Sequence, residues 1–145
     1  MAALAGLQVI RSGIHGYGIV ATRRFEPGDV IAVVDGVLWS GEEDQDDRYS
    51  LWLGDDWFYD MVDQTRWINH SCDPNGEVEA GLEGDPPRAW ARIVAIRPIA
   101  PGDEITYDYG FTADVAEPCA CGARSCRGFI IDEEELPRLL VRSTG

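Results

Sequence analysis

The sequence predicts a single domain that is mostly β, with small sheets joined by irregular loops and a few short helices. Its 145 residues are enough to build one hydrophobic core. Sixteen glycines and eight prolines separate short runs of β-branched and apolar residues, a pattern typical of short strands that alternate with turns. Helical periodicity does not extend over more than about two turns anywhere before residue 130, and no internal repeat is apparent.

Five segments are expected to form strands. Residues 30–34 read Val-Ile-Ala-Val-Val after a Pro-Gly turn, so we expect a buried strand there. Residues 89–96 follow a loop rich in glycine and proline, and residues 104–107 are entered through a second Pro-Gly turn. Two shorter strands are expected at 8–10 and 18–21.

Two helices are expected, a short one within residues 43–53 and another over residues 132–141. The second has acidic residues at its start and Arg138 and Arg142 near its end, as the helix dipole favours. Pro137 limits this helix, because proline is accommodated only in the first turn.

The formal net charge of −14 bears on the choice of partners. A field of this sign repels phosphates, so we expect no direct binding to nucleic acid. It favours a basic, lysine-containing protein or peptide instead. The alternative is that the acidic surface serves only solubility.

We expect neither a membrane span nor a secretory signal. No apolar run approaches the ~20 residues that a bilayer requires. The first six residues lack a basic region and a full apolar core. A cytoplasmic location is therefore expected, or the nucleus if the source is eukaryotic, and disulfides are not expected in such a reducing compartment.

The four cysteines predict a structural zinc site. Cys119, Cys121 and Cys126 lie close together in the sequence and supply three ligands, whereas zinc takes four. Cys72 is the natural fourth ligand, since a four-thiolate site would use every cysteine of the chain. The alternative is a set of separate buried thiols or a disulfide pair.

Three further segments carry the chemistry of the chain. Residues 66–75 read Arg-Trp-Ile-Asn-His-Ser-Cys-Asp-Pro-Asn, and residues 102–109 read Gly-Asp-Glu-Ile-Thr-Tyr-Asp-Tyr. Residues 15–18 read His-Gly-Tyr-Gly, which by itself is no more than a common turn pattern.

Together these segments resemble the SET domain of protein lysine methyltransferases, followed by a cysteine-rich post-SET segment. Residues 66–75 resemble the family's R-F-I-N-H-S-C-x-P-N with Trp67 in place of Phe, and residues 102–109 resemble G-E-E-L-T-[FY]-D-Y. Residues 119–129 resemble C-x-C-x4-C-R-G-[WYF]. The resemblance implies a β-clip fold with a pseudoknot-like crossing, divided into a SET domain (1–117), a post-SET zinc segment (118–131) and a C-terminal helix or tail (132–145).

The resemblance also implies S-adenosylmethionine as cofactor and a lysine side chain of a protein as methyl acceptor. The residues implied to bind the cofactor are His15, Gly16, Tyr17, Gly18, Asn69, His70, Tyr109 and Phe129. For Asn69 and His70 the alternative is a buried polar pair within the crossing, and for Phe129 it is a core side chain.

Tyr109 is the expected catalytic residue, with Tyr107 beside it. A lysine amine has a pKa near 10.4 and must lose its proton before it attacks a methyl carbon. An apolar, aromatic channel lowers that pKa, and a tyrosine hydroxyl can align the amine. The alternative for Tyr109 is a packed strand tyrosine. The family carries Phe or Tyr at the position of Tyr107, and tyrosine there implies one or two methyl groups per lysine.

One segment departs from the family pattern. Many members carry E-Y-x-G-E near the strand that follows the first turn, whereas this chain has Val-Val-Asp-Gly-Val at residues 33–37. The tyrosine that helps to form the lysine site is absent there. This leaves two alternatives to an enzyme: an inactive SET-like zinc module that only binds, or a zinc-dependent scaffold unrelated to methyl transfer.

Overall fold

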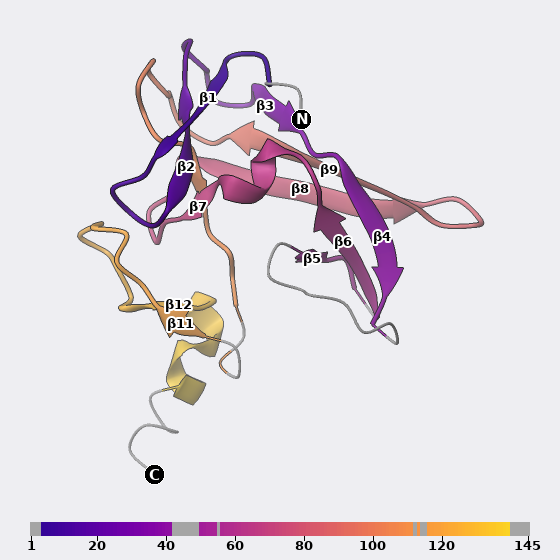
Figure 1. Ribbon diagram of the computed structural model, residues 1–145. Coiled ribbons are helices and arrows are strands. Elements are labelled where there is room, and N and C mark those ends of the chain that lie inside the picture. Colours follow the sequence, from indigo (N-terminus) through magenta and orange to yellow (C-terminus); the bar gives the residue numbers. More distant parts are fainter. Residues whose placement is uncertain (1–3, 42–49, 55, 112, 114–115, 140–145) are drawn as a thin grey trace.

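The computed structural model describes residues 4–41, 50–54, 56–111, 113 and 116–139 (Figure 1). Within them the chain forms twelve strands, which pair into five small sheets. The prediction of a mostly β domain built of small sheets is confirmed. Among the described residues, no helix has both the length and the apolarity needed to cross a bilayer.

The sheets contain two or three strands each. The first is a hairpin of β1 (Leu7–Arg11) and β2 (Tyr17–Ala21). One three-stranded sheet has the order β3 (Val30–Val33), β9 (Arg88–Ala95), β8 (Gly76–Glu83). The other has the order β4 (Gly36–Ser40), β6 (Trp57–Met61), β5 (Ser50–Trp52). Two further pairs are β7 (Asn69–His70) with β10 (Thr106–Tyr107) and β11 (Glu117–Pro118) with β12 (Phe129–Ile130).

The five predicted strands all appear, as β1, β2, β3, β9 and β10. The prediction for residues 104–107 was too long, because Glu104 forms only an isolated bridge to Val20 and β10 begins at Thr106. Strands such as β4 and β6 were not predicted. Their glycine, aspartate and aromatic residues hide the alternation of apolar and polar positions that marks a strand.

The expected helix at residues 43–53 is wrong where it can be compared. Residues 42–49 lie outside the described part of the chain, and Ser50–Trp52 form strand β5. At the C-terminus, the 3₁₀ turn η3 (Glu133–Glu135) leads into helical residues 136–139, while 140 and 141 are not described. The side chain of Asp132 caps this helix by accepting a hydrogen bond from the Glu134 N–H.

An internal repeat is present, contrary to the expectation from the sequence. Residues 19–31 read IVATRRFEPGDVI and residues 93–105 read IVAIRPIAPGDEI, so eight of thirteen positions are identical. In each copy a strand leads into a Pro-Gly-Asp turn, with Gly28 at φ 91° and Gly102 at φ 93°. Glycine adopts this left-handed conformation without the steric cost that other residues incur.

The two copies of the repeat bind each other reciprocally through their backbones. Phe25 and Ile99 exchange both hydrogen bonds, at 3.0 and 2.9 Å. Ala21 donates to Asp103 at 2.9 Å, and its equivalent Ala95 donates to Asp29 at the same distance. This pattern is that of a local two-fold axis through the Phe25–Ile99 bridge, and it brings the N-terminal hairpin against the segment that leads into β10.

The hydrophobic core occupies equivalent positions in the two copies. Ile19 and Ile93 are equivalent, as are Phe25 and Ile99, and all four are at most 1% exposed. The largest fully buried side chains of the described residues are Phe25, Ile19, Ile68, Ile93, Ile99, Ile105, Ile131 and Thr65. The repeat therefore supplies five of these eight side chains.

The parallel β7–β10 pair joins segments more than thirty residues apart. Thr106 pairs with Asn69 and Tyr107 with His70. The Asn75 side chain adds a second link between these segments, accepting from Thr106 N at 3.0 Å and donating to Glu104 O at 2.8 Å. This is the contact between distant segments that the predicted crossing requires. Figure 1 shows β11 and β12 below this pair, apart from the larger sheets.

Candidate functional site

Asn69 binds the loop at residues 15–18 to strand β7. Its Nδ2 donates to the backbone oxygens of His15 at 3.1 Å and Tyr17 at 2.9 Å, and to Glu104 Oε2 at 3.0 Å. The Asn69 side chain is buried, so these acceptors satisfy an amide that would be costly to leave unpaired. Through the Asn69 side chain, the segment at residues 66–75 thus binds both the loop at residues 15–18 and Glu104 of the segment at residues 102–109.

Glycine suits the two positions 16 and 18 of this loop for different physical reasons. Gly16 has φ 47°, a left-handed conformation that favours glycine, and open space surrounds the position of its missing Cβ. Gly18 lacks a positive φ, but a Cβ there would lie 2.7 Å from Glu104 Oε2. Gly18 therefore leaves room for the Glu104 carboxylate, and its predicted part in cofactor binding stays a prediction.

Tyr109 lies at the centre of an aromatic group. Its ring centroid is 4.9 Å from that of Tyr107, 5.6 Å from Phe111 and 5.4 Å from the His70 imidazole. The Tyr109 hydroxyl donates its hydrogen to the Ile68 carbonyl oxygen. Toward any other group this hydroxyl oxygen can therefore act only as an acceptor.

Tyr107 is buried, with 6% of its surface exposed. Burial raises the pKa of the Tyr107 phenol, and the neighbouring Tyr109 acts in the same direction. The phenol stays protonated across the physiological range, so it remains a hydrogen-bond donor beside Tyr109.

His70 connects the aromatic group to the cysteines. Its Nδ1 accepts from the Tyr109 backbone N–H at 3.1 Å, and its Nε2 lies 3.3 Å from Cys72 Sγ. Burial lowers the pKa of the His70 imidazole, with Asp108 opposing this effect and Arg127 adding to it. The neutral ring that accepts at Nδ1 carries its hydrogen on Nε2, directed at the Cys72 sulfur.

The four cysteines form one cluster, as predicted from their spacing. All are free thiols, and their four sulfurs lie within 4.8 Å of one another. The Cys72 and Cys119 sulfurs are 3.9 Å apart, close to the ~3.8 Å expected for two ligands of a tetrahedral zinc ion with Zn–S bonds of about 2.3 Å. This arrangement fits a metal site with four cysteine ligands better than separate thiols or a disulfide pair.

The surroundings of the sulfurs act in both directions on their protonation. The sulfurs of Cys72 and Cys126 accept backbone N–H groups from Arg127 and Gly128, each at 3.4 Å. Burial raises the pKa of Cys119 to about 12. Burial also acts to raise the pKa of Cys121, but hydrogen bonds from backbone N–H groups and from the Cys119 and Cys126 thiols outweigh it and lower this pKa to about 6. Four thiolates this close repel one another, so a cation is needed to hold them all deprotonated.

An ion pair joins the cysteine-rich segment to Asp108, the residue that directly follows strand β10. Arg127 Nη2 lies 3.0 Å from Asp108 Oδ2, and the Arg127 side chain is only 13% exposed. Phe129 follows on β12 and is 37% exposed, so it is not a core side chain. Within the described residues no hydrogen bond or ring contact joins Phe129 to the other predicted site residues.

The segment that departs from the family pattern packs against Tyr59. Val34 is buried, and its backbone oxygen accepts from the Tyr59 hydroxyl at 3.3 Å. A Cβ at Gly36 would lie 2.8 Å from atoms of the Tyr59 ring. A tyrosine from a neighbouring strand thus fills the space beside this segment.

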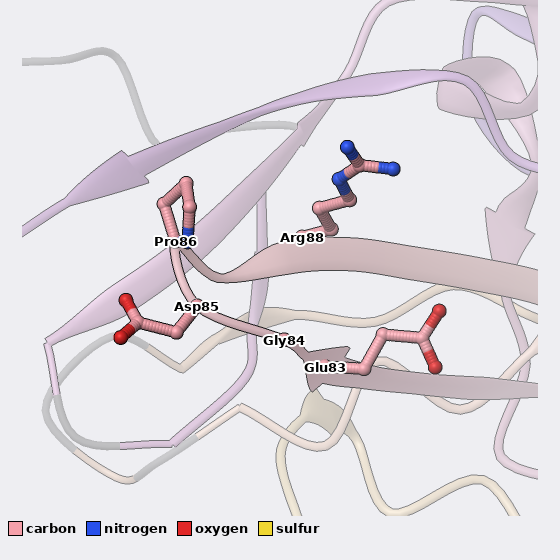
Figure 2. Close-up of a pocket in the computed structure, with 5 residues that line it drawn as sticks. All are labelled: Glu83, Gly84, Asp85, Pro86 and Arg88. Atoms are coloured by element: carbon pink, nitrogen blue, oxygen red, sulfur yellow. The ribbon is translucent and has the colours of Figure 1, made fainter.

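An open depression at the tip of the β8–β9 hairpin is lined by Glu83, Gly84, Asp85, Pro86 and Arg88. Figure 2 shows the Glu83 and Asp85 carboxylates pointing away from each other, with the Arg88 guanidinium on a third side. These groups do not converge on one point and include none of the predicted site residues. The depression is therefore not a candidate for the chemistry.

Glu104, Ser12 and Asn75 were not predicted as site residues. Glu104 accepts from Ser12 Oγ at 2.8 Å and from Asn69, and Asn75 orders the backbone on both sides of Ile105. Glu104 and Asn75 both lie in the quoted motifs, so their place in the motifs was the available signal. Ser12 has no such signal in the sequence.

Comparisons with known proteins show to which family this chain is similar. Residues 16–110 match the family described as SET domain. Human histone-lysine N-methyltransferase 2B is 36% identical over 141 residues, covering 84% of this chain and 5% of that protein.

Solved structures match as well. The crystal structure of KRYPTONITE in complex with mCHG DNA and SAH aligns with a TM-score of 0.75 and 28% identity, covering 86% of this chain and 28% of that chain. A crystal structure of KRYPTONITE in complex with mCHH DNA, H3(1-15) peptide and SAH aligns with a TM-score of 0.74 and 27% identity, covering 86% and 29%. This chain therefore corresponds to only a small part of these larger proteins.

Proposed function

Because the chain belongs to the SET-domain family, we propose that it transfers a methyl group from S-adenosylmethionine to the side-chain amine of a lysine in a protein. The observation that carries this proposal is the meeting of three segments at the β7–β10 pair. There Asn69 binds the loop at residues 15–18, and His70 binds Tyr109. The human relative is a histone-lysine N-methyltransferase, and the similar solved structures contain SAH.

The cofactor is assigned to the loop at residues 15–18, Asn69 and His70, and the resemblance to the family adds Phe129. When bound, S-adenosylmethionine would supply an electrophilic methyl carbon on a sulfonium, with S-adenosylhomocysteine as the leaving group when a neutral lysine amine takes the methyl group. Gly16 allows the left-handed turn of the loop, Gly18 leaves room for the Glu104 carboxylate, and Asn69 binds the loop carbonyls. These residues bind and orient rather than react.

Tyr109 is assigned to align the lysine amine. Since its hydrogen is donated to Ile68 O, the Tyr109 oxygen accepts an N–H of the amine and turns the nitrogen lone pair toward the methyl carbon. The aromatic group of Tyr107, Tyr109 and Phe111 disfavours an ammonium and so lowers the pKa of the incoming lysine. Tyr107 limits the room for methyl groups, in favour of one or two.

The proposed substrate is a basic, lysine-containing protein, with histones as the first class to test. The names of the relatives and the H3 peptide bound to one similar structure support this choice, as does the net charge of −14. That the chain avoids nucleic acid stays a prediction, because the similar KRYPTONITE structures also contain DNA. A cytoplasmic or nuclear location likewise stays a prediction.

Zinc is proposed as a structural ion held by Cys72, Cys119, Cys121 and Cys126. Its role is to fold the post-SET segment onto the SET domain, since Cys72 belongs to the motif of Asn69 and the other three lie beyond residue 118. The boundaries 1–117, 118–131 and 132–145 describe these proposed parts.

Labelled S-adenosylmethionine tests the proposal. Zinc-loaded protein is incubated with a panel of lysine-rich proteins, histones included, beside a Tyr109→Phe variant. We expect label on at least one panel member and a loss of about a hundredfold in rate for Tyr109→Phe, the scale of effects from misaligned reactants. No label and no cofactor binding by the wild-type protein would favour a SET-like module that only binds.

A further inference from the structure

We infer that Glu104 is a positioning residue of the cofactor site, and that Gly18 is glycine because the Glu104 carboxylate occupies the space of its side chain. Glu104 acts through Asn69 and the loop and does not itself touch the cofactor. The inference rests on the proposed function, since it takes residues 15–18 and Asn69 as cofactor-binding.

The Glu104 carboxylate connects two segments of the site. Its Oε1 accepts from Ser12 Oγ at 2.8 Å, and its Oε2 accepts from Asn69 Nδ2 at 3.0 Å. Ser12 Oγ in turn accepts from the Ile14 N–H at 2.9 Å, directly before the loop. Hydrogen bonds to a carboxylate are among the stronger ones. The Glu104 carboxylate therefore orders both Ser12, which precedes the loop at residues 15–18, and the Asn69 amide, which binds the carbonyl oxygens of that loop.

Space explains the glycine at position 18. The backbone there needs no glycine, because its φ is not positive. A Cβ would instead meet Glu104 Oε2 at 2.7 Å, with Glu104 Cδ and Ser12 Cβ both at 3.0 Å. Because the contact with Oε2 is the shortest, an alanine at this position is expected to shift the carboxylate and to weaken its hydrogen bonds to Ser12 and Asn69.

The two copies of the internal repeat show that the turn itself does not require Glu104 or Gly18. In the first copy of the repeat, Val30 stands at the place of Glu104; just before the second copy, Arg92 stands at the place of Gly18. Both copies form the same Pro-Gly-Asp turn with the same reciprocal backbone bonds. The turn thus forms without a glutamate or a glycine at these places. Gly18, beside the first copy, and Glu104, in the second, meet next to Asn69, where a site-specific role accounts for both.

The test is a double-mutant cycle read by calorimetric binding of S-adenosylhomocysteine to full-length, zinc-loaded protein. We expect Glu104→Ala and Gly18→Ala each to weaken binding about tenfold or more, with Glu104→Gln in between because it keeps one acceptor oxygen. In the Glu104→Ala background, Gly18→Ala is expected to add little, since the carboxylate it displaces is gone. In the variants with weakened binding, the KM for S-adenosylmethionine is expected to rise, while the KM for the methyl-accepting protein stays within about twofold of the wild-type value.

Gly13→Ala is the matched control, because no atom lies within 4 Å of its added methyl group and its φ is not positive. It is expected to bind like the wild type, and thermal unfolding shows whether each variant is folded. Equal loss from Gly18→Ala in both backgrounds, or wild-type affinity in folded Glu104→Ala, would overturn this inference alone. If the wild-type protein binds no cofactor, the proposed function fails and takes the inference with it.

Discussion

At Asn69, one amide reaches backbone oxygens that lie 54 and 52 positions earlier in the chain. The motif around Asn69 was enough to predict that it belongs to a site. Its partners could not be predicted, because a side-chain amide bonds to any carbonyl that the fold brings within reach. The same holds for His70, whose two ring nitrogens face Tyr109 and Cys72.

For Glu104, sequence reasoning did not even predict that the residue belongs to the site. Its position after a Pro-Gly-Asp turn suggested a strand residue, and a charged residue on a short strand is usually solvated. In the structure it is half-buried, with Ser12 and Asn69 as donors. Only the close approach of the N-terminal hairpin, which depends on the whole fold, gives the carboxylate these partners.

Replacing Tyr107 with Phe is expected to increase the number of methyl groups per lysine. The variant removes one buried hydroxyl beside Tyr109 and leaves the ring in place, so the site gains room for a methylated amine. We expect the product to shift from one or two methyl groups toward three, at a stability cost of about 1 kcal/mol. Mass spectrometry of the peptide over time measures this, and an unchanged distribution would rule out Tyr107 as the determinant.

Among the elements, the repeated strand and Pro-Gly-Asp turn are the part of the fold that was in the sequence but not recognised. The two copies lie 74 residues apart, too far for any local pattern to connect them. Short apolar runs were enough to predict β2, β3 and β9. Strands such as β11 and β12, with two residues each, leave no periodicity to detect.

Removing zinc is expected to loosen the post-SET segment. A sheet of two two-residue strands is too small to be stable alone, so the cysteine cluster and the Arg127–Asp108 pair must hold it. A strong chelator should lower Tm by roughly 10 °C, the shift expected for a loss of about 3 kcal/mol in a domain of this size. Scanning calorimetry with a zinc assay measures both quantities.

Cys126→Ser serves as the metal-site variant, and Ser125→Ala as its neighbour outside the cluster. The variant without a complete cluster should show the low Tm with or without chelator, whereas Ser125→Ala should behave like the wild type. A chelator that removes zinc without changing Tm would contradict a structural role for the cluster.

For the whole molecule, the net charge of −14 makes association with a basic substrate depend on salt. We expect the KM for a lysine- and arginine-rich peptide to rise about tenfold between roughly 0.05 and 0.5 M salt, because the Debye length shortens over this range. A peptide with the same target lysine and neutral flanks is the control. A KM that does not change with salt would confine the acidic surface to a role in solubility.

The most direct measurement is mass spectrometry of the substrate after incubation with the protein and S-adenosylmethionine, with S-adenosylhomocysteine measured in the same reaction. The account predicts methyl groups on the nitrogen of a lysine side chain, one S-adenosylhomocysteine for each methyl group, and formation of both products about a hundredfold slower with Tyr109→Phe. Methyl groups on another residue type, or equal product from the wild type and Tyr109→Phe, would contradict it.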